Sequence, residues 1–404
     1  MKLFSSVIVK QITGRRNYCV RRYPYVPWRN LEVIQSIEDE LKEPPRQVIP
    51  ENPVKRVSAT NPADHTYADV GKFYTLPPAD IKRYFQLGGI PKPFTELSKA
   101  FNETCLMIRK PFLEVRDYLI QANYSNLPNK YVLYGPVGSG KSLTLLHILH
   151  YAALQEFVIL HLPNPNYWFK WGKKEAHRSE TRPGLIDLPI EAALVLKHFQ
   201  LQNSKLLEKL ELTTSKTHEW NIRESTPAGS PIMDIVAHGI NRVKYACDCF
   251  DILIDELKVS ATNNKCKVLC AIDGYNSLYT NKTMIRIDEK YGTKPEEVSL
   301  VQSVFKITKP DWCNGAIVAA ISEKTTTPDN RGSFLPFFLL QRKGFEDLDP
   351  FIPVQVPELS EMEFHSMLDY YEDRRWLQKP GGRDEIEFIS SRIPNDIRNY
   401  CAPL

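Results

Sequence analysis

Residues 135–142 read GPVGSGKS, and this glycine-rich loop of the form GxxxxGK(S/T) constrains the fold more than any other feature of the sequence. The apolar run 131–134 precedes it, and apolar residues at helical spacing follow it, namely Leu143, Leu146 and Leu154. In this strand–loop–helix order, the glycines let backbone N–H groups point at phosphate oxygens, and the helix N-terminus adds its positive dipole end. The loop therefore predicts a parallel α/β fold that binds a nucleoside triphosphate or diphosphate.

Two side chains of the loop have predicted roles. Lys141 is expected to reach the β- and γ-phosphates, and the Ser142 hydroxyl is expected to ligate Mg²⁺. Ser322 follows a second apolar run, 316–321, and occupies the place of a polar sensor of the γ-phosphate. A serine at a strand end is also a common turn or cap residue.

Two aspartates compete as the second magnesium partner. Asp255 belongs to a segment in which Ala246, Phe250, Leu253 and other apolar residues recur every three or four positions, so a helix is predicted there. Asp273 instead ends the short continuous apolar run 268–272, which is typical of a central parallel strand. We therefore predict that Asp273 binds Mg²⁺ through a water molecule.

Alternating strands and helices organise the rest of the chain. Further strands are predicted at 157–162 and 351–356, and helices at about 99–130, 190–210 and 233–260. The predicted organisation is a transit peptide at 1–31, a proline-rich N-terminal extension at 32–98, a P-loop nucleotide-binding core at 99–330, and a last strand with a small C-terminal helical lid at 331–404.

The first 31 residues contain seven basic side chains and no acidic one, interleaved with apolar residues. This pattern is typical of a mitochondrial transit peptide, and the alternative is a basic tail that binds RNA. Removing these seven charges lowers the formal net charge from +4 to −3, which does not favour a mainly nucleic-acid-binding protein. No apolar run reaches the roughly 18–20 residues that span a bilayer.

The remaining cysteines, histidines and aromatic–basic stretch could in principle bind metal or RNA, but ordinary structural roles explain them at least as well. The eight cysteines fit a reduced compartment, and Cys247, Cys249 and Cys270 are predicted to be buried thiols. His147 and His150 share a helix face without further ligands nearby. Residues 164–174 mix aromatic and basic side chains, which predicts either a local RNA contact or buried aromatics with solvated lysines.

The sequence contains little information about the rate of nucleotide hydrolysis or about which base the nucleotide carries. Gly274 follows Asp273 where many P-loop ATPases carry a catalytic glutamate, so turnover is expected to be slow unless Glu323 or another residue substitutes. Residues 308–311 read TKPD and imitate a guanine-reading motif, but they precede a strand instead of following one.

Several stretches resemble the death-associated protein family of the small subunit of the mitochondrial ribosome. They are residues 134–142, WNIRESTPAGSP at 220–231, GINRV at 239–243, AIDGYN at 271–276, and shorter matches within 311–318, 344–353 and 370–377. The resemblance runs from about residue 70 to the C-terminus. On the family's pattern, the nucleotide-binding residues are Gly135, Gly138, Ser139, Gly140, Lys141, Ser142 and Asp273.

The resemblance implies a P-loop core of AAA+-like type that holds GTP or GDP with Mg²⁺. It also implies residence in the mitochondrial matrix, in the head of the small ribosomal subunit, with ribosomal proteins as partners and local rRNA and large-subunit contacts. A link to apoptosis is implied as well. The sequence thus favours a structural ribosomal component with slow or no hydrolysis, and the alternative is a free regulatory P-loop NTPase that acts as a signalling switch.

Overall fold

The computed structural model describes residues 54–169, 175–281, 283–285, 287, 292–325, 332–377 and 380–402. The predicted transit peptide and the first part of the predicted N-terminal extension lie outside these residues, as do Lys170 to Lys174. Within the described ranges, no helix combines the length and the apolar character that crossing a bilayer demands.

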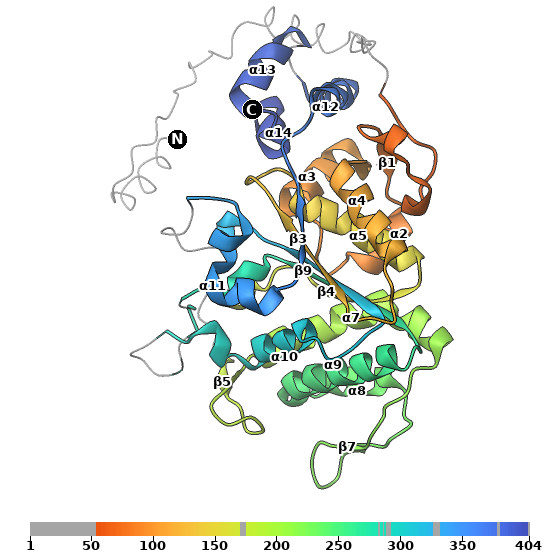
Figure 1. The fold of residues 1–404 in the computed structure, drawn as a ribbon, viewed down its shortest axis with the longest axis vertical. Coiled ribbons are helices and arrows are strands. Elements are labelled where there is room, and N and C mark those ends of the chain that lie inside the picture. The colour runs from red at the N-terminus through yellow and green to blue at the C-terminus, as the bar shows by residue number, and fades with distance from the viewer. Residues whose placement is uncertain are drawn as a thin grey trace, which may run out of the picture. The chain divides into compact units, whose positions relative to one another are not determined.

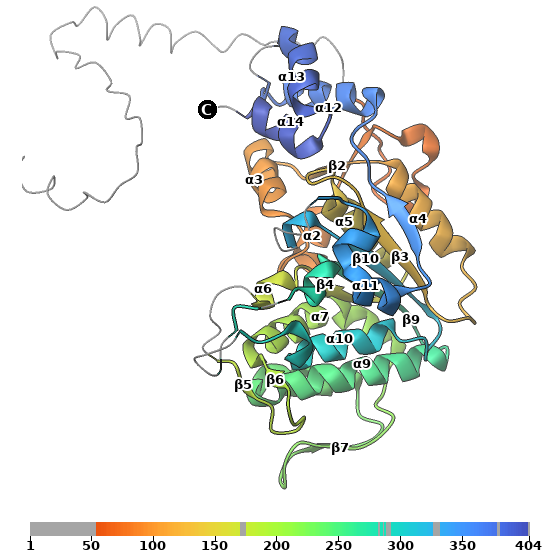
Figure 2. The same ribbon diagram turned by 60° about the vertical axis from the view of Figure 1, so that its left-hand side comes forward.

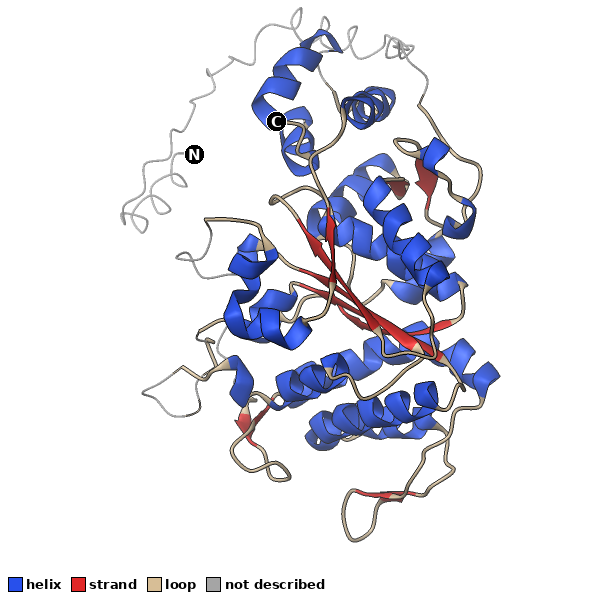
Figure 3. Cartoon of the chain, viewed as in Figure 1, coloured by secondary structure: helices blue, strands red, loops and turns tan. Residues whose placement is uncertain are grey.

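A five-stranded parallel sheet lies at the centre of the described residues (Figure 3, red). Its strand order is β11-β3-β10-β9-β4. The register pairs Ala320 with Leu133 on one side and with Asp273 on the other, so the three middle strands end side by side. The strands are β3 (Asn129–Tyr134), β4 (Phe157–Leu162), β9 (Lys267–Asp273), β10 (Gly315–Ala320) and β11 (Ile352–Gln355).

Helices cover both faces of the sheet, and alternate strand residues point to each face (Figure 1). Val132 and Ile272 pack on one side, and Leu133 and Ala271 on the other, which explains why the strands are continuous apolar runs. The apolar cluster on one face includes residues of α7 (Pro189–Leu210), α8 (Ile232–Asn241), α9 (Ala246–Thr262), α10 (Ser299–Thr308) and α11 (Pro336–Leu348, with a break at Gln341). Among these, α8 packs on α7 and α9, and α10 packs on α9. The cluster on the other face includes residues of α2 (Pro78–Tyr84), α4 (Lys110–Gln121) and α5 (Lys141–Leu154).

The N-terminal part of the described chain packs against the C-terminal helices. A third apolar cluster joins residues 73–105 to residues 359–401, with Phe101 and Tyr371 in ring contact across it. Figure 2 shows α3 beside α14, in agreement with Figure 1. The elements are β1 (Phe73–Thr75), α3 (Lys92–Phe101) and β2 (Cys105–Met107), together with α12 (Glu361–Asp373), α13 (Arg383–Ser390) and α14 (Pro394–Cys401).

Short elements complete the described chain. A hairpin of β7 and β8 projects at the lower edge of Figure 1. The remaining elements are α6 (Asn166–Phe169), β5 (His177–Arg178), β6 (Ile186–Asp187), β7 (His218–Glu219), β8 (Ser225–Thr226) and the 3₁₀ turns Pro62–Asp64, Tyr67–Asp69, Val243–Tyr245, Tyr275–Tyr279, Pro295–Glu297, Glu323–Thr325 and Pro380–Gly382.

Two predicted helices are wrong in extent. The segment 99–130 is not one helix, because Asn102 adopts a left-handed conformation that ends α3, and Pro111 in the first turn begins α4 after β2. The segment 233–260 divides into α8 and α9, because Arg242 has non-helical dihedral angles, with φ −117° and ψ 72°. The five predicted strands and the helix at 190–210 are confirmed.

Candidate functional site

The glycine loop between β3 and α5 depends on backbone conformations that only glycine adopts freely. Gly135, Gly138 and Gly140 have φ angles of 148°, 84° and 102°. A Cβ atom on Gly135 would lie 2.2 Å from the carbonyl oxygen of Val356, just after β11. A Cβ atom on Gly138 would lie 2.9 Å from Cβ of Asn395, at the start of α14. The loop is therefore held closely between the sheet and the last helix.

Lys141 begins α5 and is buried beneath the loop. Its Nζ donates hydrogen bonds to the carbonyl oxygens of Gly135 and Pro136, each at 2.7 Å. Burial lowers the pKa of Lys141 from 10.5 to about 8, against the opposing charges of Glu323 and Asp273. The ammonium group is thus positioned where it can exchange its carbonyl partners for an anion.

Ser142 and Asp273 meet at the carboxyl end of β9. Asp273 accepts a hydrogen bond from the Ser142 side chain. Burial raises the pKa of Asp273 from 3.8 to about 6, although the Ser142 bond, the Lys141 charge and the Gly274 N–H oppose this shift. A hydroxyl and a carboxylate oxygen in contact are suitable ligands for a hard cation such as Mg²⁺. Both residues line the same cavity as Lys141.

Asp255, the rejected alternative, lies in α9 as the periodicity predicts. Its carboxylate is 3.0 Å from Nζ of Lys306 on α10, away from the loop. Asp311 of the TKPD motif pairs with Lys258 and does not line the cavity. The structure thus brings Asp273, and neither of these carboxylates, to the glycine loop.

Ser322 follows β10 and lines the cavity beside Lys324. Its backbone is fixed by Asn276, which accepts from the Ser322 N–H and donates to the Ser322 carbonyl, both at 2.9 Å. Gly274 has a φ angle of 76° and donates to the Ala320 carbonyl at 2.8 Å. No role for Asn276 was predicted from the sequence, although it lies three residues after the strand-end Asp273.

Arg109, also missed, connects the loop to the C-terminal segment. Its Nη1 donates to the carbonyl of Ser139 at 2.7 Å, and its Nε lies 3.3 Å from the carboxylate of Glu363 in α12. Its Nη2 donates to the carbonyls of Pro357 and Glu358, at 3.0 and 3.1 Å. Because these partners are distant in sequence, no local pattern identifies Arg109.

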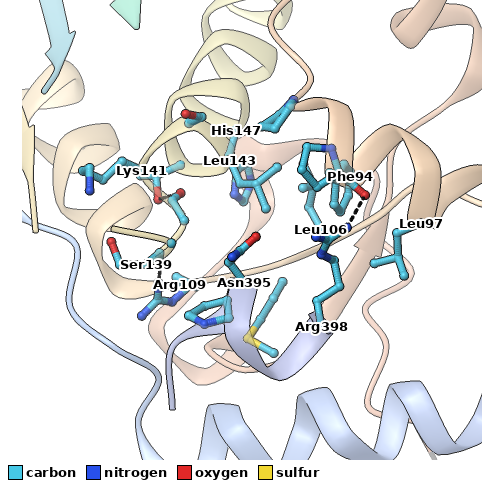
Figure 4. Close-up of a pocket in the computed structure, with 18 of the residues that line it drawn as sticks. Phe94, Leu97, Leu106, Arg109, Ser139, Lys141, Leu143, His147, Asn395 and Arg398 are labelled. Atoms are coloured by element: carbon cyan, nitrogen blue, oxygen red, sulfur yellow. Dashed lines mark hydrogen bonds between the residues drawn. The ribbon is translucent and has the colours of Figure 1, made fainter. Parts of the chain in front are cut away.

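One cavity of about 450 Å³ extends from the loop into an apolar chamber (Figure 4). In Figure 4, Lys141 and Ser139 lie on one side, Phe94, Leu97 and Arg398 on the opposite side. The labelled lining residues are Phe94, Leu97, Leu106, Arg109, Ser139, Lys141, Leu143, His147, Asn395 and Arg398. The volume falls within the range of roughly 300–1,000 Å³ typical of small-molecule sites.

Other predicted residues lie in the core. Cys247, Cys249 and Cys270 are buried, and burial raises the pKa of each thiol. His147 is buried and its Nε2 lies 3.3 Å from Nδ1 of His65, while His150 lies 3.3 Å from Asp80.

The aromatic side chains of the segment 164–174 differ in burial. Trp168 and Phe169 are core residues, and Tyr167 is exposed. The two buried rings are therefore not available to stack on bases, and the basic end of the segment lies outside the described residues.

Comparison with known proteins decides the family. The family model of mitochondrial ribosomal death-associated protein 3 matches residues 106–395. The chain belongs to this family. It is 36% identical over 356 residues to the small ribosomal subunit protein mS29 of Bos taurus, covering 87% of this chain and 88% of that protein. The protein of the same name from Mus musculus is 36% identical over 365 residues, which cover 89% and 92% of the two chains.

A fungal relative is more distant. The small ribosomal subunit protein mS29 of Neurospora crassa is 23% identical over 223 residues, 55% of this chain and 46% of that protein. The match to the family includes the glycine loop, Asp273, Ser322 and the start of α14. The family expected from the sequence is therefore confirmed.

Proposed function

We propose that the chain is a component of the small subunit of the mitochondrial ribosome that holds a guanine nucleotide, GTP or GDP, with Mg²⁺ at the glycine loop. The family match and the two mammalian relatives, each a small ribosomal subunit protein by name, support the ribosomal part. Contacts with ribosomal proteins of the subunit head, local rRNA and the large subunit belong to the same proposal, as does the family's link to apoptosis.

The nucleotide part rests on one observation above all. Gly138, Gly140, Lys141 and the contacting pair Ser142 and Asp273 line a single cavity at the carboxyl ends of adjacent parallel strands. Ligands of open α/β sheets bind at this edge. This strand–loop–helix arrangement of P-loop type gives backbone donors and one ammonium for phosphates, and oxygens for Mg²⁺. The AAA+-like classification remains part of the proposal.

Slow turnover follows from the residue after Asp273. Gly274 carries no side chain that can orient a water molecule, and positioned general bases contribute typically 10²–10⁴-fold to rate. The charge of Glu323 acts to raise the Lys141 pKa, which makes Glu323 a candidate substitute. We expect hydrolysis well below the common range of roughly 1–10³ s⁻¹.

Lys141→Ala tests the nucleotide site. The substitution should weaken nucleotide binding at least tenfold, about 1.4 kcal/mol, because it removes the ammonium group that lies directly beneath the loop. Lys92→Ala is the matched control, since Lys92 is exposed and its partner Glu96 lies 3.9 Å away. Binding is measured by equilibrium titration of stripped protein. Equal affinities for Lys141→Ala and the unchanged protein would refute the assignment.

Sedimentation separates the proposal from its alternative. Tagged protein in a mitochondrial extract should co-sediment with the small ribosomal subunit, and chromatography of the extracted ligand should identify a guanine nucleotide. A protein found only in the light fractions, with rapid hydrolysis in isolation, would favour the free regulatory NTPase.

A further inference from the structure

The cavity has two chemically different ends. Gly138, Gly140, Lys141 and Asp273 line a charged and polar end. Phe94, Leu97 and other apolar side chains form the opposite chamber, across from Lys141 in Figure 4. If phosphates lie along the loop, as the proposed function requires, the base of the nucleotide extends away from it. A planar base buries its two faces well between apolar side chains. The chamber is therefore the place for the base.

Helix α14 supplies polar groups to this chamber. Asn395 and Arg398 both line the cavity, three residues apart on the same helix. Asn395 carries an amide that both donates and accepts, so it does not by itself distinguish one purine from another. Arg398 carries only donors.

The guanidinium of Arg398 is incompletely paired within the described residues. Its Nη1 donates to the carbonyl of Pro93 at 3.3 Å, a long bond, and its Nη2 donates to Asn399 at 2.6 Å. Its Nε is buried and has no hydrogen-bond partner among the described residues. Because Nε is buried, the groups that a ligand in the cavity can reach are Nη1 and Nη2, and the long bond from Nη1 to Pro93 can be exchanged for a bond to a ligand acceptor.

Guanine and adenine differ at the edge that such a donor reads. Guanine presents two acceptors, O6 and N7, whereas adenine presents N7 beside a donating amino group. A donor-only guanidinium is complementary to the first edge and opposes the second. Among the described residues that line the cavity, Asp273 at the phosphate end is the one carboxylate, so no acid reads the 2-amino group of guanine.

We propose that Arg398 selects guanine over adenine by donating to O6 and N7 of the base in this chamber. The proposal rests on the proposed nucleotide-binding function and adds the group that determines base specificity. It further requires that inosine triphosphate, which keeps O6 and N7 and lacks the 2-amino group, binds nearly as well as GTP.

The test is competition of unlabelled GTP, ITP and ATP against labelled GTP on protein stripped of nucleotide with a chelator and returned to Mg²⁺. For the unchanged protein, GTP and ITP should agree within about threefold, and ATP should be at least tenfold weaker, about 1.4 kcal/mol. Arg398→Gln should reduce the preference for GTP over ATP to threefold or less. Arg398→Lys, which keeps a donor, should retain part of it.

Arg392→Gln is the matched control. Arg392 precedes α14, pairs with Glu387 at 3.6 Å and does not line the cavity, so the preference should be unchanged. An unchanged preference in Arg398→Gln, or ITP more than tenfold weaker than GTP, would overturn the inference while leaving nucleotide binding intact. Absence of any nucleotide binding, or no effect of Lys141→Ala, would overturn the proposed function itself. Should Arg398→Gln not fold, the comparison of the three nucleotides and Arg398→Lys still decide the matter.

Discussion

Arg109→Ala should destabilise the protein far more than a typical point substitution. The Arg109 side chain pairs with Glu363 at 3.3 Å, and the two side chains are only 10% and 7% exposed. Removing one partner of a buried ion pair costs about 3–5 kcal/mol, because the remaining charge stays buried without compensation. The carbonyls of Ser139, Pro357 and Glu358 also lose their donor.

The expected loss is therefore about 3–5 kcal/mol, a large part of a total stability of roughly 5–15 kcal/mol. Part of the Glu363 carboxylate remains satisfied, because it accepts from the Ser360 N–H at 2.9 Å in the N-cap of α12. This bond and local relaxation keep the expected loss within that range and not above it.

Urea unfolding of nucleotide-free protein measures this loss, since bound ligand would add its own stabilisation. Arg342→Ala is the control, because its pair with Glu346 is 88% and 61% exposed and should contribute at most about 0.5 kcal/mol. The double variant with Glu363→Gln should cost less than the sum of the single changes, by about 1–3 kcal/mol. A loss below 1 kcal/mol for Arg109→Ala, or strict additivity, would refute the role given to Arg109.

Three further outcomes follow. Gly135→Ala should lower the free energy of unfolding by at least about 2 kcal/mol, because the new Cβ would lie 2.2 Å from the Val356 carbonyl oxygen. Gly184→Ala is the control: its Cβ would meet nothing within 4 Å, so it should cost only about 1 kcal/mol for its positive φ. Urea unfolding of the two variants measures the difference. Burial lowers the pKa of His198 from 6.5 to about 4. As the pH decreases, the unfolded chain therefore binds this proton before the folded protein does, and the free energy of unfolding decreases once the pH is below about 6.5. His198→Gln should remove about 2 kcal/mol of the stability difference between pH 7 and pH 5, and an unchanged difference would contradict this. Among the described cysteines, the half-buried Cys313 should react first with iodoacetamide at pH 8, as peptide mass spectrometry can establish.

The sequence predicts the structure of the glycine-loop end of the cavity because its parts are contiguous. The loop, the strand before it and the helix after it occupy residues 129–154 without interruption, and short-range patterns suffice. Asp273 is distant from the loop, but the end of a buried strand has a fixed place in a parallel sheet, so periodicity could select it over Asp255.

The chamber end is not predictable in this way. Arg109 contacts residues 248 and 254 positions away, and α14 reaches the loop through a hydrogen bond from the Asn395 N–H to the Gly138 carbonyl. No periodicity encodes such contacts. The break between α3 and α4 did have a local signal, since Pro111 begins a helix more readily than it continues one.

The position of the chamber between the two ends of the described chain has an energetic consequence. Its walls come from α3 and β2 on one side and from α12 and α14 on the other, which share one apolar cluster. Neither half encloses the chamber alone, so a ligand there binds only the arrangement in which the C-terminal helices are docked. At a concentration one hundred times its Kd, such a ligand stabilises that arrangement by about 2.7 kcal/mol. Under the proposed function, a slowly hydrolysed nucleotide would then act as a fixed part of the fold, which is the role a structural subunit requires and a switch does not.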